Sequence, residues 1–400
     1  MKVLYIGYLL PEEDYEKNKA LSFAAGRFER GFVNSLSKNK NVEIETISIE
    51  PILKRFPKEK FWVEKRKNLS LVGEKITSET LGYINFPFLK HLCIYIGIWK
   101  HIQEWKNKYR NEKKVIISYN ADAPIIQIGL RAEKQGIHYI PILADIPYYD
   151  EVKEQNHISL TRRLSLIGHK SQYKNLPRLK QAVVLNENAA IDFQLPKHIL
   201  IEGAVTESET QILSVTAKRE ERKNVFYCGL LGPFHGTKNL IEAARKTPEV
   251  SFLICGRGES PECTVEVKNA ASELENFHYF GEVDNKRLRE LQANADLMVI
   301  PHPMGLKQLK YQFPSKLMTC MATGVPVLMT KLPGLPEEYS RYVCFVDGDS
   351  GVCIAEGITN FFKIDFQKRI EMGQNARNFV LKNKTWDIQA KKIIDFAEGL

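Results

Sequence analysis

The feature that most constrains the fold is an alternation of short apolar runs, rich in β-branched residues, with longer amphipathic stretches. In the first half, strands are expected at KVLYIGYL, VEIETISI, VIISYN, HYIPILAD and AVVLN. Helices are expected between them, over Ala24–Leu36, Phe88–Tyr109, Ala123–Gln135 and around Leu160–Tyr173. Continuously apolar strands that alternate with helices are typical of a parallel sheet covered on both faces. The first half therefore predicts a doubly wound α/β domain.

The same alternation restarts after a polar stretch, Thr206–Lys223. Strands are expected at NVFYCGLL, VSFLICGRGE, FHYFGEV, DLMVIPHP, VPVLMT and VCFVDG, with helices over Lys238–Arg245, Thr264–Leu274, Asn285–Ala293 and Ser315–Thr323. Two last helices, Phe366–Lys382 and Trp386–Glu398, have no strand after them. A chain of 400 residues also has the length of two domains. We predict a first Rossmann-like domain over 1–205, a linker over 206–223, a second Rossmann-like domain over 224–382, and a C-terminal helix over 383–400 that packs towards the first domain.

The N-terminal run MKVLYIGYLL is too short for a membrane span and lacks the cleavage site of a signal peptide. We expect it to form a buried strand, in a protein of the cytoplasm. The seven cysteines contain no CxxC pair and are expected to be reduced. The nine histidines lie apart in the sequence, and we expect no Asp-x-Asp metal site, so no metal is predicted.

Charge is distributed unevenly between the halves. Residues 1–200 hold 32 Lys and Arg against 22 Asp and Glu, whereas residues 201–400 hold 25 against 26. Within the basic half, the segment Ile52–Lys67 (ILKRFPKEKFWVEKRK) interleaves seven basic residues with aromatic ones. This pattern favours an anionic membrane surface, and no motif indicates nucleic acid. A solvated loop or helix face is the alternative.

The predicted helix Phe88–Tyr109 is a second candidate for a membrane-facing surface. Its apolar residues Leu92, Ile96, Trp99 and Ile102 fall near one stripe. Packing of this stripe against the sheet is the alternative, and the one that we favour.

Two segments of the second half suit an anion. The turn Gly229–Lys238 joins a strand to a helix through three glycines, which lets a phosphate approach the backbone at a helix N-terminus. In FPSKLMTCMATG, Pro314 favours the first turn of a helix and places Ser315 and Lys316 at its N-terminus. A diphosphate is the predicted ligand. A tight turn and a capped core helix without any ligand are the alternatives.

The second segment resembles the donor-site signature of glycosyltransferase family 4, the retaining enzymes of the GT-B fold. The matching residues are Pro314, Ser315, Lys316, Leu317, Met321, Ala322, Gly324, Pro326 and Val327. The glycine-rich turn, the run Gly256-Arg257-Gly258 and Phe280-Gly281 occur in the family's order. The resemblance covers the second half and implies an α/β protein of two facing Rossmann-like domains.

The resemblance also implies a function. It predicts retaining, metal-independent transfer of a hexose from a nucleotide sugar, a UDP- or GDP-sugar, to a saccharide or lipid-linked acceptor in polysaccharide synthesis, without a cofactor. The residues expected to act in catalysis are Lys316, Lys238, Arg257 and Asp145. Donor binding is expected from Gly229, His235, Gly236, Thr237, Gly256, Gly258, Tyr311, Pro314, Ser315, Leu317 and Thr319. A phosphate or acceptor loop is expected at Gly7, Gly26 and Arg27, which open the first half.

Departures from the family's pattern at four positions leave the function open. The basic residues that the family carries in the glycine-rich turn are replaced by Leu230 and His235. The paired glutamates of the family, eight residues apart, fall at Tyr311 and Thr319. A binding or scaffold subunit that has lost activity is therefore the alternative, and a sugar-nucleotide epimerase on the same fold is a third reading.

Overall fold

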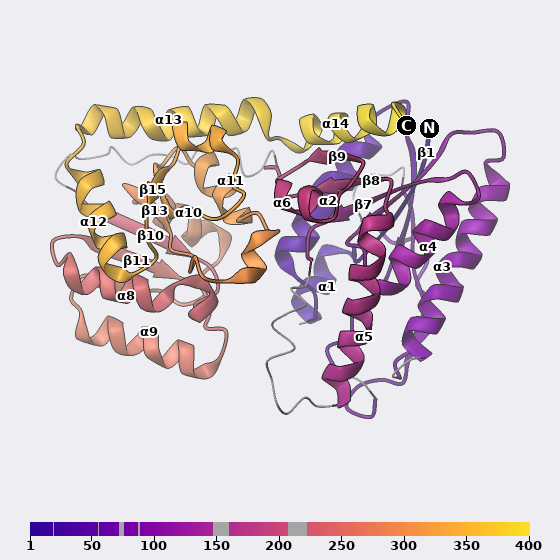
Figure 1. The fold of residues 1–400 in the computed structure, drawn as a ribbon. Helices are drawn as coiled ribbons and strands as arrows, with labels where there is room; N and C mark the ends of the chain where they lie inside the picture. The colour runs from indigo at the N-terminus through magenta and orange to yellow at the C-terminus, as the bar shows by residue number, and fades with distance from the viewer. Residues whose placement is uncertain (19, 55, 72–75, 87–88, 147–159, 207–221) are drawn as a thin grey trace. The chain divides into compact units, whose positions relative to one another are not determined.

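The computed structural model describes residues 1–18, 20–54, 56–71, 76–86, 89–146, 160–206 and 222–400 (Figure 1). The chain divides into two compact units, and each is described by itself. Unit 1 consists of Met1–Ala204 together with Trp386–Leu400, and unit 2 consists of Val205–Thr385. The predicted linker over 206–223 lies almost wholly outside the described residues.

Unit 1 is built on a seven-stranded parallel sheet in the order β4-β2-β1-β6-β7-β8-β9. The strands are β1 (Lys2–Gly7), β2 (Glu43–Ser48), β4 (Thr77–Thr80), β6 (Lys114–Tyr119), β7 (His138–Leu143), β8 (Gln181–Val184) and β9 (Lys197–Leu200). Its helices are α1 (Glu12–Lys17), α2 (Phe23–Ser37), α3 (Leu89–Lys108), α4 (Ala123–Glu133), α5 (Leu160–Asn175), α6 (Glu187–Asp192) and α14 (Trp386–Glu398). Two short strands, β3 (Trp62–Val63) and β5 (Tyr83–Ile84), pair antiparallel beside it.

Unit 2 is built on a six-stranded parallel sheet in the order β12-β11-β10-β13-β14-β15. The strands are β10 (Asn224–Cys228), β11 (Ser251–Cys255), β12 (Phe277–Tyr279), β13 (Leu297–Ile300), β14 (Val327–Thr330) and β15 (Cys344–Val346). Its helices are α8 (Thr237–Lys246), α9 (Pro261–Glu273), α10 (Asn285–Ala293), α11 (Ser315–Ala322), α12 (Gly351–Phe362) and α13 (Phe366–Asn383). The prediction of two doubly wound α/β sheets is confirmed.

The last helix belongs to unit 1 because its first residue is buried there. The Trp386 ring packs edge-on against Phe28, with ring centroids 4.7 Å apart, and lies over Gly31 of α2. A Cβ at Gly31 would stand 2.1 Å from Trp386 Nε1, so only glycine admits the indole. Ser35 adds a hydrogen bond of 2.7 Å to Asp387. Helix α14 is thereby held on α2.

The buried stripe of α3 differs from the predicted one. Ile94, Ile98, Ile102 and Trp105 face the core, whereas Leu92 and Ile96 are exposed. The packing against the sheet that we favoured for the predicted stripe was therefore wrong for Leu92 and Ile96, because apolar residues occupy both sides of this helix and its periodicity is ambiguous. In the described part of the chain, no helix combines the length and the apolar character needed to cross a membrane.

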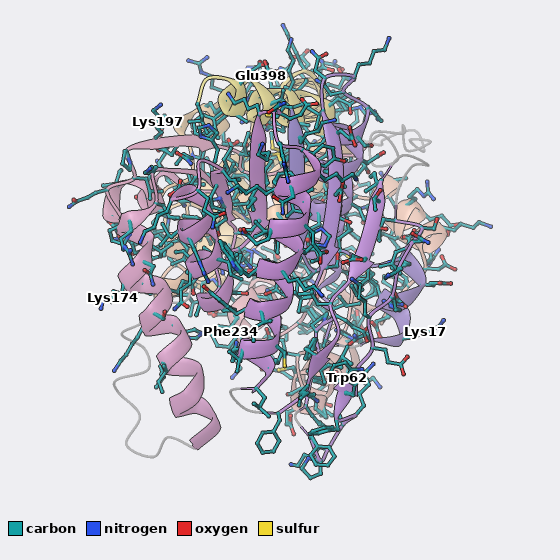
Figure 2. All side chains as sticks on the ribbon, turned by 90° about the vertical axis from the view of Figure 1, so that its right-hand side faces the viewer. Lys17, Trp62, Lys174, Lys197, Phe234 and Glu398 are labelled. Atoms are coloured by element: carbon teal, nitrogen blue, oxygen red, sulfur yellow. The ribbon has the colours of Figure 1, made fainter. Side chains whose placement is uncertain are left out.

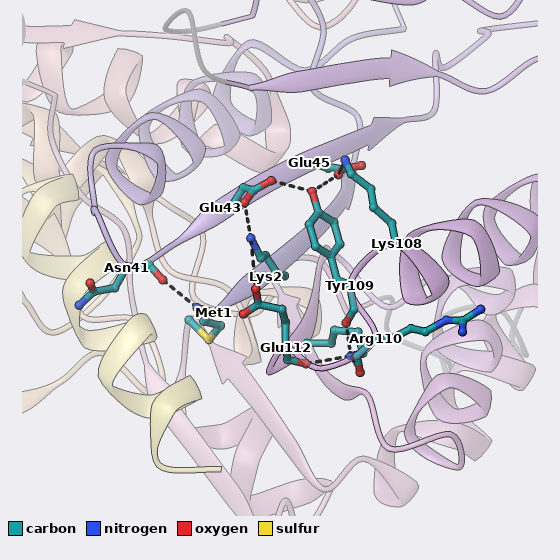
Figure 3. A network of polar contacts seen from close by, with 10 residues as sticks. Met1, Lys2, Asn41, Glu43, Glu45, Lys108, Tyr109, Arg110 and Glu112 are labelled. Atoms are coloured by element: carbon teal, nitrogen blue, oxygen red, sulfur yellow. Dashed lines mark hydrogen bonds and ion pairs between the residues drawn. The ribbon is translucent and has the colours of Figure 1, made fainter.

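A polar network ties the amino ends of β1 and β2 to the end of α3 (Figure 3). The Tyr109 hydroxyl lies 2.6 Å from Glu43 Oε1 and 2.7 Å from Glu45 Oε1. Lys108 pairs with Glu45 at 2.6 Å, and Lys2 pairs with Glu43. Ligands of parallel sheets bind at the opposite, carboxyl edge. We therefore assign this network to stability.

Candidate functional site

The sheet orders mark one ligand-binding position in each unit. In unit 1 the strand order reverses beside β1, so the carboxyl ends of β1 and β6 flank the reversal. In unit 2 it reverses beside β10, so the carboxyl ends of β10 and β13 flank it. Open parallel sheets bind ligands in the crevice at such a reversal, because the two connections leave in opposite directions. The turns after these four strands are therefore the candidate ligand-binding positions.

In unit 2, the turns after β10 and β11 approach each other through two glycines. Gly229 and Gly256 have φ angles of 147° and 129°, a region that side chains disfavour. A Cβ at Gly256 would stand 1.8 Å from the carbonyl oxygen of Gly229. Leu231 N–H donates to the carbonyl of Arg257 at 2.8 Å, which closes the two turns on each other. Glycine is therefore required at both of these predicted donor-binding positions, because of the backbone conformation and the close approach of the two turns.

The rest of the glycine-rich turn is held by a buried hydroxyl group and by contact with the end of β13. Thr237 is buried, and its hydroxyl accepts a hydrogen bond of 2.7 Å from Gly232 N–H. Gly236 has a φ angle of 70°, and a Cβ there would stand 1.6 Å from the carbonyl oxygen of Pro301, which follows β13. The turn after β10 therefore touches the end of β13 at the reversal of the sheet. Thr237 shapes this turn through its hydroxyl.

Lys316 reaches this turn from the first turn of α11. Its Nζ donates to the Tyr227 hydroxyl at 3.0 Å and lies 4.6 Å from the centre of that ring. The Tyr227 hydroxyl in turn donates to the carbonyl of Leu230 at 2.6 Å. A Cβ at Gly229 would stand 2.0 Å from Lys316 Nζ, so the glycine makes room for the ammonium group. Burial lowers the pKa of Lys316. An anion in the turn would offset that cost.

Two neutral histidines line the same turn. The His235 and His302 rings lie 5.9 Å apart, and burial is the main cause that lowers the pKa of each to about 4. Lys316 contributes to both shifts. His235 Nε2 lies 3.0 Å from Glu259 Oε1, which is a hydrogen bond because the imidazole is uncharged at neutral pH. Lys316 is therefore the cation that this turn presents.

The other predicted cations lie elsewhere. Lys238 is exposed on α8 and pairs with Glu266 of α9 at 4.0 Å. Arg257 is exposed, and its backbone carbonyl takes part in the contact between the turns. The sequence placed both beside Lys316 as catalytic residues. Of these three residues, only Lys316 has its charged group against Gly229, whereas Lys238, at the end of the glycine-rich turn, points towards Glu266.

The remaining donor-site candidates divide into packing residues and helix-terminus residues. Tyr311 and Leu317 are buried. Pro314 precedes α11 as its cap, and Ser315 is exposed at the first position. The Thr319 hydroxyl donates to the carbonyl of Lys316 at 2.9 Å, so it is engaged within its own helix. Gly258 lies against Thr264, whose Oγ1 would stand 2.3 Å from a Cβ there.

The expectation that the chain has no Asp-x-Asp motif was wrong. Asp347-Gly348-Asp349 does follow β15. Asp349 Oδ2 accepts a hydrogen bond of 2.7 Å from Met304 N–H, so this carboxylate has a structural role. Within the described ranges, no three His, Cys, Asp or Glu side chains are placed to hold a metal ion.

In unit 1, the turn after β1 rests on a buried carboxyl group. Glu29 of α2 is fully buried, and its Oε2 accepts from the Tyr8 N–H at 2.9 Å and the Tyr5 hydroxyl at 3.0 Å. A Cβ at Gly7 would stand 2.0 Å from the same oxygen, so this predicted loop residue must be glycine. Burial raises the pKa of Glu29 to about 8. The carboxyl group is therefore mostly protonated at neutral pH.

Across the reversal, polar groups gather after β6 and β7. The Tyr8 hydroxyl donates to Asp122, which precedes α4. Asn120 has a φ angle of 63°, and its side-chain oxygen accepts from Asp145 N–H at 2.8 Å. Burial raises the pKa of Asp122, and burial with the charge of Asp122 raises that of Asp145. The predicted residue Asp145 thus lies at the carboxyl edge of the sheet, where its N–H is bonded to Asn120.

Tyr8, Asn120 and Asp122 were not predicted as site residues. A signal was present, because these residues directly follow the two strands that flank the reversal. Gly26 and Arg27 were expected in a loop, which was wrong: both lie within α2, which begins at Phe23 with Ser22 as its cap. Gly26 lies under the Tyr15 ring, and Arg27 is exposed on the helix.

Known proteins resemble this chain in sequence and in fold. Residues 208–379 match the model of the glycosyl transferases group 1. A GDP-mannose-dependent alpha-(1-6)-phosphatidylinositol monomannoside mannosyltransferase of Mycobacterium tuberculosis is 26% identical over 190 residues, 45% of this chain and 48% of that protein. The chain thus matches about half the length of this curated relative.

Solved structures match along the whole chain. Sucrose-phosphate synthase from Thermosynechococcus elongatus has a TM-score of 0.66 and 14% identity, over 100% of this chain and 99% of that one. HepE from Anabaena, solved in complex with UDP, has a TM-score of 0.62 and 15% identity, over 100% of both chains. These likenesses support the predicted GT-B type of fold. The match over residues 208–379 shows that most of the second unit is similar to the group 1 glycosyl transferases.

Proposed function

We propose that this protein is a retaining, metal-independent glycosyltransferase that takes a hexose from a UDP- or GDP-sugar. The observation that carries the proposal is the position of Lys316, which enters the glycine-rich turn at the reversal of the unit 2 sheet. The family match over this unit supports it. The mycobacterial relative is named as GDP-mannose-dependent, and HepE was solved with UDP.

In this proposal the protein positions the diphosphate and stabilises its charge. Negative charge grows on the leaving diphosphate as the glycosidic bond breaks, and a fixed cation in a partly dry site lowers that barrier by several kcal/mol. Lys316 and the N-terminal N–H groups of α11 supply the positive charge. The departing phosphate oxygen takes the proton of the acceptor hydroxyl, so no protein nucleophile is required.

The loss of the family's two glutamates favours one competing function, a binding subunit without turnover. Tyr311 is buried, and the Thr319 hydroxyl is bonded to its own helix, so neither position offers a carboxylate. Slow release of nucleotide from the donor in water discriminates the two functions. An enzyme is expected to release UDP or GDP and to lose this activity at least about tenfold in Lys316→Ala. Donor binding without any release would support the binding subunit.

The acceptor is proposed to be a saccharide or a lipid-linked saccharide of a polysaccharide pathway, met at the inner face of the membrane. The relative's named substrate carries phosphatidylinositol. In this chain Phe56, Phe61 and Trp62 are all exposed, and Figure 2 shows Trp62 at one end of unit 1. The rings of Phe56 and Phe61 pack edge to face, with their centroids 5.2 Å apart. An exposed aromatic cluster of this kind suits insertion among lipid headgroups.

The charge of this segment is smaller than the sequence implies. Lys60 pairs with Glu50 at 3.3 Å, Lys65 with Glu79 at 2.6 Å, and Arg66 with Asp14 at 2.8 Å. Changing Lys65 or Arg66 would therefore disturb the fold as well as the surface. The exposed Lys54 and Lys58 are better sites for a charge test.

Vesicle sedimentation tests the membrane proposal. The double variant Phe61→Ser with Trp62→Ser, and the double variant Lys54→Glu with Lys58→Glu, are each expected to lose binding to phosphatidylglycerol vesicles. Val265→Ser, at a residue of unit 2 with similar exposure, is the matched control. Salt is expected to weaken the wild-type binding. Equal binding to neutral vesicles, or unchanged binding in both double variants, would contradict this proposal.

A further inference from the structure

Unit 1 holds a large cavity that has no role in the proposed binding of the nucleotide sugar, because that site lies in unit 2. It has a volume of about 750 Å³ and lies among residues of α3, α4 and α5, which can be followed in Figure 1. Pockets that bind small molecules have volumes of roughly 300–1,000 Å³. The cavity is therefore large enough for a ligand of that class.

The walls of the cavity are mainly apolar from the core to the surface. Ile94 and Ile125 are buried in its wall. Leu53, Leu92 and Ile167 also line it, with exposures of 61%, 54% and 59%. Large apolar side chains that are exposed to water along one wall are unfavourable. An apolar ligand that covers them lowers the free energy, because it removes apolar surface from water. The wall therefore selects a chain of methylene groups or a similar apolar body.

One part of the cavity lining is polar and lies at the carboxyl edge of the sheet. The Tyr8 hydroxyl and Asp122, which are bonded to each other, both line it. Gln172 also lines it and is only 3% exposed, and its Nε2 has no hydrogen-bond partner among the described residues. His169 Nδ1, in the same wall, is likewise buried without a partner in the described part of the chain. Buried polar groups without hydrogen-bond partners are rare, and hydroxyl groups of a ligand would give Gln172 Nε2 and His169 Nδ1 such partners.

We propose that this cavity binds the acceptor as an amphiphile, with its alkyl chain along Leu53, Leu92, Ile94 and Ile167 and a hydroxyl-bearing headgroup at Tyr8, Asp122 and Gln172. The inference rests on the proposed glycosyl transfer and adds to it the chemical class of the acceptor. It differs from membrane docking, because Phe61 and Trp62 are not among the residues that line the cavity. The chain of the acceptor enters the protein, and the headgroup hydroxyl stays at the edge of the sheet where ligands react.

Gly168 gives a direct way to fill the cavity. It lies on α5 in the cavity wall, and a Cβ there meets no described atom within 4 Å. Gly168→Phe therefore occupies the space of the alkyl chain without a clash at its Cβ. Gly168→Ala is the matched control, because it makes the same helix substitution and leaves most of the cavity open.

The experiment titrates octyl glucoside and methyl glucoside into the full chain by calorimetry, below the concentration at which the octyl compound forms micelles. The wild type is expected to bind octyl glucoside at least about tenfold more tightly than methyl glucoside, because each buried methylene group adds to the affinity. Gly168→Phe is expected to lose at least about tenfold in octyl glucoside affinity, whereas Gly168→Ala stays within about twofold of wild type. The double variant Phe61→Ser with Trp62→Ser is expected to bind as wild type.

Gln172 tests the polar end. Gln172→Leu is expected still to bind octyl glucoside more tightly than methyl glucoside. It is expected to lose more affinity for octyl glucoside than for octane-1,2-diol, because the substitution removes one hydrogen-bond partner of the sugar hydroxyl groups. Equal losses for both ligands would overturn the assignment of the headgroup to Gln172. Equal affinity of octyl glucoside for the Phe and Ala variants of Gly168, or no preference over methyl glucoside, would overturn the cavity proposal.

A nucleotide titration on the same samples separates this inference from the proposed function. UDP and GDP are expected to bind unchanged in Gly168→Phe, because the glycine-rich turn belongs to unit 2. Loss of octyl glucoside binding with intact nucleotide binding in that variant supports the cavity. Octyl glucoside binding by a wild type that binds neither nucleotide would contradict the proposed function and leave the cavity as a lipid site.

Discussion

Replacing Glu29 by Gln should remove a pH-dependent loss of stability from unit 1. Glu29 is fully buried, and burial is the main cause that raises its pKa to about 8. The ordinary pKa of 4.5 applies in the unfolded chain. Between these two values the folded protein retains a proton that the unfolded protein releases. The contribution of Glu29 is therefore most favourable below pH 4.5 and is lost as the pH rises towards 8.

The size of the effect follows from the two pKa values. One pKa unit corresponds to about 1.4 kcal/mol, so the 2.5 units between pH 4.5 and 7 correspond to a loss of about 3 kcal/mol in the free energy of unfolding at pH 7. A Gln side chain does not titrate, and its oxygen can still accept from Tyr8 N–H and the Tyr5 hydroxyl. Glu29→Gln is therefore expected to be more stable than wild type at pH 8 and to gain little at pH 4.5.

Urea unfolding followed by tryptophan fluorescence measures this difference for unit 1 alone. All four tryptophans of the chain, at positions 62, 99, 105 and 386, lie in that unit. Measurements at pH 5, 6, 7 and 8 should show a gap between variant and wild type that widens with pH. Glu104→Gln, at an exposed residue of α3, is the matched control and should run parallel to wild type. A constant gap between Glu29→Gln and wild type across this range would refute the buried, protonated carboxyl group.

Four further substitutions test the tight turn after β10, the attachment of α14 and the position of the ribose. Gly236→Ala should cost more than about 2 kcal/mol in urea unfolding followed by circular dichroism, because its Cβ would stand 1.6 Å from the carbonyl oxygen of Pro301. Gly281→Ala, with a similar φ angle of 69° but no atom within 4 Å of the added Cβ, should cost only about 1 kcal/mol, and equal costs would contradict the reasoning. Trp386→Ala should destabilise unit 1 by about 3–5 kcal/mol by the fluorescence of the remaining tryptophans, and a value near zero would mean that α14 is not held as described. Thr319→Glu should tighten nucleotide binding in calorimetry if the ribose lies beside α11, and weaker binding would place the ribose elsewhere.

Most strands of both sheets were predictable because buried parallel strands are continuously apolar, but the edge strands β4 and β9 of unit 1 were not predicted. The elements that were missed lack this signal. The strand TSET of β4 is polar, and β3 and β5 span two residues each. Helix α12, with the sequence GVCIAEGITNFF, contains two glycines and β-branched residues and follows a strand directly, so its period is obscured.

The candidate site was predictable to the extent that it is local in sequence. Lys316 and the glycines were found because turn geometry and a helix N-terminus leave a mark in consecutive residues. The position of Lys238 was not, because it depends on the phase of α8, which turns the side chain towards Glu266 on the surface. The roles of Glu29 and Asp122 depend on burial and on contacts with Tyr8 from another strand, which a single sequence does not reveal.

The central claim is that Lys316 in the glycine-rich turn binds the diphosphate of a nucleotide sugar. Calorimetric titration of UDP and GDP into wild type, Lys316→Met and Lys246→Met tests it most directly. Lys246 is an exposed lysine at the end of α8 and serves as the matched control. Wild type and Lys246→Met are expected to bind one of the two nucleotides equally well, and Lys316→Met is expected to bind it at least about tenfold more weakly. Equal affinity of Lys316→Met and wild type, or no binding of either nucleotide to the wild type, would contradict it.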